Sequence, residues 1–126
     1  MRATIIRTNG RVEDFVVHDY RDIQNAVGGL FCAVLQQDGY TLYGNDEAKI
    51  ASVGETIGMP LNLSAMLLVS HVMECDLQDL VTLHGDFIMV GEDGEERDIA
   101  ELNQEHTALA EKFCMWQEPQ MSITTL

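Results

Sequence analysis

Three side chains that commonly bind metals lie at helical spacing near the middle of the chain. His71, Cys75 and Asp79 are four residues apart, and that spacing predicts one shared helix face. His and Cys at this separation can share a zinc ion, but a structural zinc needs four ligands. The remaining candidate, His84, follows a predicted break in the helix. The sequence therefore predicts a half-buried helix face here and no metal site.

The same residues do not predict nucleophilic catalysis. Cys75 could be paired with His71 or His84, but no helix N-terminus or cationic side chain is near Cys75 in the sequence to stabilise a thiolate. The glycines are spaced as turn and cap residues, because no GxxxxGK[ST] occurs and no GxGxxG follows a strand. We therefore expect a protein that is not an enzyme and needs no cofactor.

Two groups of side chains are candidates for binding. The first is an acidic run on a glycine-containing loop and the outer face of a predicted last helix. Helical carboxylates four residues apart rise about 6 Å per step, close to the separation of neighbouring phosphates, so the run could imitate nucleic acid or could equally be a solvated face. The second group lies on a strand and the loop after it, where tyrosines could contact a small ligand or pack in the core. The acidic group is Glu92, Asp93, Glu95, Glu96, Asp98, Glu101 and Glu105; the second is Tyr40, Tyr43, Asn45 and Lys49.

Charge is the strongest signal in the composition. Seven basic residues face 21 acidic ones, a formal net charge of −14. From Glu74 to Glu118 there are 13 acidic residues against only Arg97 and Lys112. Such a surface repels nucleic acid, phosphorylated ligands and anionic membranes, and it attracts basic partners. An anionic ligand would require Arg7, Arg11, Arg21 and Lys49 to converge at a pocket.

The sequence has no signal for a membrane or an oxidising compartment. No apolar run reaches about 18 residues. The apolar run at the start of the chain is too short for the apolar region of a signal peptide, because the sequence soon turns polar. Cys32, Cys75 and Cys114 are odd in number, far apart and set among apolar residues. Free buried thiols in a reducing compartment are the simpler interpretation. We expect a cytoplasmic protein.

The first half of the chain predicts two hairpins joined by a short helix. Strands over residues 3–7 and 12–18 flank Asn9-Gly10, a strong hairpin signal. Asp19 predicts the start of a helix that Gly28-Gly29 ends. Residues 30–35 are continuously apolar, which predicts a central strand covered on both faces, and residues 40–43 form its return strand.

The second half predicts a helix, a strand and another helix. Asn62 or Ser64 can cap an apolar helix through Met73, and residues 87–90 form a strand. Asp98 can cap an amphipathic helix whose stripe of Leu102, Leu109 and Phe113 could pair with a second copy of the chain. We expect an α+β fold: an antiparallel or mixed sheet of about five strands with two or three helices on one face. The expected units are residues 1–97, the helix 98–118 and a tail 119–126.

Several short motifs resemble a known family. They are Val27-Gly28-Gly29, Tyr40 to Glu47 (YTLYGNDE), Asn62 to Ala65 (NLSA) and Gly85 to Val90 (GDFIMV). In this order they resemble the family filed as domain of unknown function number 3846, whose members are small proteins of phages, plasmids and the bacteria that carry them. The likeness covers about residues 3 to 100, so the last helix would be an addition. The family commonly has Val where this chain has Gly44, and it implies no activity.

The resemblance and the charge together suggest a function. The setting implied by the family is the cytoplasm of a bacterial host. We expect a non-enzymatic interaction protein that binds a basic host protein through its acidic surface. Its specific form would be a counter-defence inhibitor that mimics nucleic acid. The alternative is a protein that binds a small ligand, such as a signalling nucleotide, at Tyr40, Tyr43 and the following loop.

Overall fold

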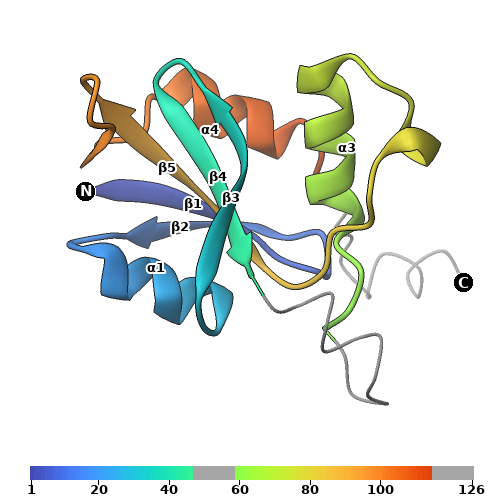
Figure 1. The fold of residues 1–126 in the computed structure, drawn as a ribbon, viewed down its shortest axis with the longest axis horizontal. Coiled ribbons are helices and arrows are strands. Elements are labelled where there is room, and N and C mark those ends of the chain that lie inside the picture. The colour runs from blue at the N-terminus through green and yellow to red at the C-terminus, as the bar shows by residue number, and fades with distance from the viewer. Residues whose placement is uncertain (47–58, 115–126) are drawn as a thin grey trace, which may run out of the picture.

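The computed structural model describes residues 1–46 and 59–114. They form a six-stranded antiparallel sheet and three α-helices (Figure 1). In chain order the elements are β1 (Arg2–Ile6), β2 (Val12–Val16), α1 (Tyr20–Val27), β3 (Phe31–Gln37), β4 (Tyr40–Asn45), α3 (Leu63–Met73), the 3₁₀ turn η1 (Leu77–Asp79), β5 (Phe87–Asp93), β6 (Asp98–Ala100) and α4 (Gln104–Glu111). The predicted small α+β fold is confirmed.

The strand order brings the two halves of the chain together. The order is β2-β1-β5-β4-β3, and β6 pairs with the last residues of β5. Both predicted hairpins form, β1 with β2 and β3 with β4, and β5 lies between them. The start of β5 therefore lies beside the ends of β1 and β4. The end of β5 lies beside β6 and the β3–β4 turn, where the Glu92 amide donates to the Gly39 carbonyl at 3.0 Å.

Helices cover both faces of the sheet, which corrects the prediction that they lie on one face. On one face α1 buries Ile23 and Val27 against Ile5 and Ile88. On the other, α3 and the residues around α4 bury a second cluster, which includes Leu42, Leu68, Met89, Leu102 and Ala110. A strand covered on both sides is continuously apolar, and the buried residues Phe87 to Val90 of β5 fit that pattern.

The central strand is β5, and the apolar stretch at residues 30–35 is not central. That stretch forms most of β3, which lies at the edge of the sheet and is only partly buried. Its register shifts between Ala33 and Leu35, where the strand has a bulge. Bulges are frequent on edge strands because they disturb further pairing. Apolar composition alone did not distinguish an edge from a centre.

The helix α1 is fixed by short-range hydrogen bonds at both ends. Asp19 accepts from the amide of Arg21 at 2.9 Å, as predicted for an N-cap. Asp22 in turn accepts from the amide of His18 at 2.7 Å, so two backbone donors are satisfied reciprocally. At the other end Gly28 adopts φ +85°, a left-handed conformation that glycine tolerates.

Asn62 caps α3 and joins it to the sheet. Its Oδ1 accepts from the amide of Ala65 at 3.0 Å. Its amide nitrogen Nδ2 donates to the carbonyls of Ile6 and Gly85, each at 2.9 Å. The side chain is fully buried and all three of these bonds lie in the interior. Asn62, rather than Ser64, is thus the cap, and it fixes α3 to the ends of β1 and β5.

The C-terminal part differs from its prediction. The last helix does not begin at Asp98: residues Asp98–Ala100 form β6, and α4 begins at Gln104 with Asn103 as its cap. The side chain of Leu102 is buried, while Leu109 and Phe113 pack against the same core cluster. The predicted apolar stripe is therefore used within the chain. The expected tail, 119–126, lies outside the described residues.

Candidate functional site

An acidic surface lies at the end of the sheet where β5 turns into β6. Its carboxylates come from the end of β5, the β5–β6 turn, β6, the residue after β6 and the start of α4, and every one of these residues is exposed. Asp93 and Asp98 lie directly opposite each other in the β5–β6 ladder. We call this surface the acidic end; it consists of Asp93, Glu95, Glu96, Asp98, Glu101 and Glu105.

Glu92 does not belong to this exposed surface, contrary to the prediction. Only 3% of its side chain is exposed. Its Oε1 accepts from the Tyr43 hydroxyl and its Oε2 from Nε of Arg97, both at 2.5 Å. Alternation along β5 points Glu92 toward the α1 face, where a buried carboxylate requires such partners. Six of the seven predicted carboxylates remain exposed.

Arg97 turns its charge inward, away from the acidic end. Besides the bond to Glu92, its Nη2 donates to the carbonyls of Gln37 and Tyr40 and to Oγ1 of Thr41, at 2.7 to 3.1 Å. Arg97 is the only lysine or arginine between residues 92 and 111 of the sequence. From outside this stretch, Arg2 reaches the acidic end: its amide donates to Oε1 of Glu101 at 2.9 Å and its Nη2 to the carbonyl of Leu102 at 3.4 Å.

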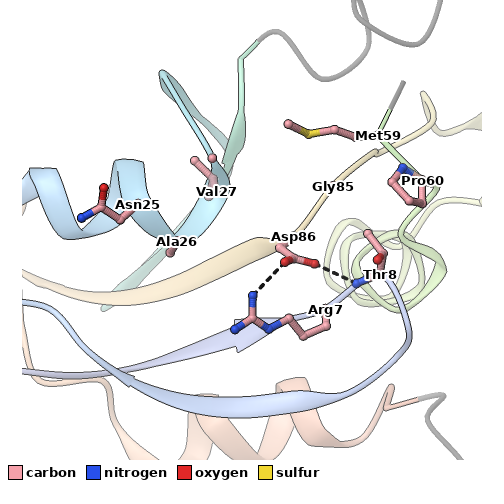
Figure 2. Close-up of a pocket in the computed structure, with 10 residues that line it drawn as sticks. Arg7, Thr8, Asn25, Ala26, Val27, Met59, Pro60, Gly85 and Asp86 are labelled. Atoms are coloured by element: carbon pink, nitrogen blue, oxygen red, sulfur yellow. Dashed lines mark hydrogen bonds and ion pairs between the residues drawn. The ribbon is translucent and has the colours of Figure 1, made fainter. Parts of the chain in front are cut away.

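A pocket of about 360 Å³ lies at the opposite end of the sheet (Figure 2). Its wall comes from the segment after β1, the last turn of α1, the chain before α3 and the residues that lead into β5. Figure 2 shows Arg7 and Asp86 facing each other across its floor, with Met59 on the far side. The pocket thus has a charged part and an apolar part.

Arg7 and Asp86 form the charged part. Nη1 of Arg7 lies 2.8 Å from Oδ2 of Asp86, and its Nε lies 2.6 Å from Oε2 of Glu13. Oδ1 of Asp86 accepts from the amide of Thr8 at 3.0 Å. These hydrogen bonds, first that to Asp86, raise the pKa of Arg7 above its ordinary value, so the guanidinium stays charged between two carboxylates.

The family comparison gives a match that spans all of the described residues. The model of the family described as Domain of unknown function (DUF3846) matches residues 1–114. The chain belongs to this family. The match includes α4, so the expectation that the last helix is an addition beyond residue 100 is wrong. No curated protein and no solved structure matches the chain.

The motifs that indicated the DUF3846 family converge at the pocket end. Val27, Gly28, Gly85 and Asp86 line the pocket. Asn62 donates to the Gly85 carbonyl, and Nδ2 of Asn45 donates to the Val27 carbonyl at 3.1 Å. Segments far apart in the sequence therefore build one corner of the fold. The sequence alone indicated each motif but not that they meet.

The second predicted group of site residues is not brought together. Tyr40 and Tyr43 are both buried and lie on opposite faces of the sheet. Burial raises the pKa of the Tyr40 hydroxyl, and burial together with the Glu92 hydrogen bond raises that of Tyr43. The Asn45 side chain is engaged with α1, and Lys49 lies outside the described residues. The two tyrosines are explained by packing in the core.

The basic residues required for an anionic ligand are also dispersed. Of Arg7, Arg11 and Arg21, only Arg7 lines the pocket, and it already faces two carboxylates. The last turn of α1, whose dipole end is negative, lies beside it. In the part of the chain that the structure describes, the surroundings of this pocket disfavour a phosphate.

The His71, Cys75 and Asp79 spacing does not give one helix face. The helix α3 ends at Met73, and Glu74 takes a left-handed conformation with φ +54°, so the chain changes direction before Cys75. Within residues 1–46 and 59–114, no three His, Cys, Asp or Glu side chains are grouped to hold a metal. Over the same residues, no helix is long and apolar enough to cross a membrane.

Proposed function

We propose that this protein is a non-enzymatic interaction protein that binds a basic protein surface through its acidic end. The observation that carries the proposal is the pair Asp93 and Asp98. Like charges directly opposite in an antiparallel ladder destabilise the sheet. The nearest basic residue in the sequence, Arg97, is engaged with buried Glu92 instead. A lysine or arginine of a partner would supply the missing counter-charge.

The geometry of the acidic end suits a partner that normally holds nucleic acid. Strand residues two apart on one face are separated by about 6.6 to 6.8 Å, and helical residues four apart rise about 6 Å. Both spacings resemble the separation of neighbouring phosphates along a nucleic-acid strand. A surface of this kind steers basic partners to it and repels nucleic acid. The specific form of the proposal is a phage or mobile-element protein that occupies the nucleic-acid groove of a host protein in the bacterial cytoplasm.

Capture from bacterial lysate tests this proposal. The protein is immobilised, and bound proteins are identified at about 0.1 M and at about 0.3–0.5 M salt, where screening is short-ranged. A basic partner released by the higher salt, and displaced by DNA or RNA, supports the proposal. Capture of no partner, or of a partner that is indifferent to salt, contradicts it.

A pair of variants with equal charge change assigns the surface. The test variant combines Asp93→Asn, Glu95→Gln, Glu96→Gln and Asp98→Asn. The control neutralises four exposed carboxylates elsewhere, Asp14, Glu74, Asp76 and Asp79. We expect the test variant to lose the partner and the control to keep it. Equal loss by both would mean that net charge alone, and not the acidic end, holds the partner.

A further inference from the structure

Two backbone carbonyls beside the Arg7–Asp86 pocket accept no hydrogen bond from the residues that the structure describes. The last four carbonyls of a helix have no partner within it. In α1 the Gln24 carbonyl accepts from the amides of Gly28 and Gly29, and the Val27 carbonyl accepts from Asn45. The carbonyls of Asn25 and Ala26, which belong to pocket-lining residues, have no such partner among the residues that the structure describes. A ligand that donates hydrogen bonds would satisfy them.

The charge around the pocket favours a cation. Arg7 lies between Glu13 and Asp86, so this trio carries one net negative charge. The negative dipole end of α1 adds to it, and the last turn of α1 contains no basic residue to offset it. An anion would meet both Asp86 and this helix end. The pocket therefore attracts the opposite charge to that expected for a nucleotide phosphate.

The shape of the cation follows from the contacts already made. Both carboxylate oxygens of Asp86 accept one hydrogen bond, from Thr8 and from Arg7, so no free edge remains for a bidentate guanidinium. An ammonium is a compact charge with three donors and can use the remaining lone pairs. Among the described residues that line the pocket, Asp86 is the one carboxylate, too few for a hard divalent cation. Met59 and Pro60 offer apolar surface to an alkyl chain.

We propose that this pocket binds an alkylammonium group, with the ammonium against Asp86 and the free carbonyls of α1 and the alkyl chain over Met59. Such a group is the head of a lysine side chain or of a free aliphatic diamine. The volume of about 360 Å³ is in the range of small-ligand sites. The site is separate from the acidic end, at the other end of the sheet, and does not depend on the function proposed there.

The test is a ¹H–¹⁵N correlation titration of the full chain with n-butylammonium. We expect shifts of the amides of Thr8, Gly28 and Asp86. Butyrate has the opposite charge and 1-butanol has none, and we expect neither to produce these shifts. Equal shifts with 1-butanol would show an apolar crevice without charge selection and would overturn the proposal, as would an absence of shifts with n-butylammonium.

Two variants with the same charge change locate the site. Asp86→Asn removes the carboxylate in the pocket, and Asp38→Asn removes an exposed carboxylate in the β3–β4 turn, at the other end of the sheet. A charge-assisted hydrogen bond contributes enough binding free energy that we expect Asp86→Asn to weaken binding about tenfold or more. We expect Asp38→Asn to leave binding within about twofold. Equal loss in both variants, or in neither, overturns the proposal.

A third variant tests whether n-butylammonium binds in the pocket if Asp86→Asn does not fold. Asn25 is exposed and lines the pocket, so Asn25→Lys places a tethered ammonium at the end of α1. We expect it to abolish the n-butylammonium shifts, while Asn25→Gln retains them. Unchanged binding to Asn25→Lys overturns the proposal. The variant in which Asp93, Glu95, Glu96 and Asp98 are neutralised should still bind n-butylammonium. Loss of the shifts in that variant would show that the overall negative charge of the protein, and not the pocket, attracts the cation.

The source of the ammonium is distinguished by comparing two further probes. Cadaverine represents a free diamine, and the peptide acetyl-Gly-Lys-Gly-amide represents a protein side chain. Tighter binding of one assigns the natural ligand to its class, and equal binding shows that the alkylammonium head alone is recognised. Binding of neither probe contradicts the proposal.

Discussion

Arg97 donates a hydrogen bond from Nε to Oε2 of Glu92 across 2.5 Å, although the two residues come from a stretch that reads as a uniform acidic loop. The pair lies across the β5–β6 turn, in which Arg97 itself adopts φ +56°. Tyr43 contributes a second bond to the same carboxylate. One acid of the run is thus a structural element of the sheet, and the others are left at the surface.

Removing Arg97 should destabilise the fold through Glu92. In Arg97→Leu the buried carboxylate keeps only the Tyr43 hydroxyl, and breaking such a pair costs roughly 3 kcal/mol. The double variant Glu92→Gln/Arg97→Leu removes the unpaired charge, so we expect it to recover most of that loss. Urea unfolding of the wild type, both single variants and the double variant measures the coupling. Additive losses would mean that the two residues do not act as a pair.

Neutralising Asp98 should stabilise the protein. Asp98→Asn removes the like-charge pair with Asp93, and we expect the free energy of unfolding to rise by about 0.2–1 kcal/mol. The gain should shrink in high salt because exposed charges are screened. Glu96→Gln, which changes the same charge in the turn outside the ladder, is the control. A loss of stability on Asp98→Asn would show that another contact offsets the repulsion.

Gly44 and Phe87 should behave as a compensating pair. Gly44 of β4 lies beside the Phe87 ring of the neighbouring strand β5, and a Cβ at Gly44 would overlap that ring. Gly44→Val therefore forces a shift that we expect to cost about 1–3 kcal/mol. Phe87→Leu leaves room, so the double variant should be more stable than the sum of the single changes predicts. The Phe87 ring fills the space that a side chain at position 44 would need.

The fall in the free energy of unfolding at alkaline pH should depend on Tyr43. Burial, followed by the Glu92 hydrogen bond, raises its pKa in the folded state above the ordinary value of 10.0. Above pH 10 the unfolded chain therefore releases this proton while the folded chain retains it, so the free energy of unfolding falls as pH rises. The contribution is fully present below pH 10. We expect the fall to be shallower in Tyr43→Phe, measured by urea unfolding between pH 8 and pH 11.

Tyr40→Phe is the comparison variant for this pH dependence. Tyr40 is also buried, on the opposite face of the sheet from Tyr43. We expect Tyr40→Phe to flatten the alkaline fall less than Tyr43→Phe does, because the Tyr43 hydroxyl also donates to the Glu92 carboxylate. A steep alkaline fall that persists in Tyr43→Phe would assign the titration to Tyr40, whose pKa burial also raises.

Local features of the fold could be predicted from the sequence, and non-local ones could not. The hairpins, the Asp19 and Asn62 caps and the Gly28 stop follow from short-range chemistry, and all are present. The insertion of β5 between the hairpins depends on contacts across the whole chain, for which no local pattern exists. The strand β6 is only three residues long, so its alternation could not be distinguished from the start of a helix.

For the candidate sites too, local features could be predicted from the sequence and non-local ones could not. Charge predicted where acidic side chains would gather, but the burial of Glu92 depended on which face of β5 it occupies. The pocket was missed because its wall combines the segment after β1, the end of α1 and the chain around residues 59 and 85. The available signal was the set of family motifs, whose glycines and asparagines lie at element ends. Without the strand order they could not be placed side by side.

The Asn62 side chain has a consequence for how the molecule folds. Its hydrogen bonds reach residues 56 positions earlier and 23 positions later in the chain. The residue that caps the first turn of α3 is therefore also bonded to the end of β1 and to the segment that leads into β5. Such long-range contacts slow folding and couple a helix to the sheet. Hydrogen exchange at Ala65 should then occur through global opening of the molecule and not through fraying of the helix end.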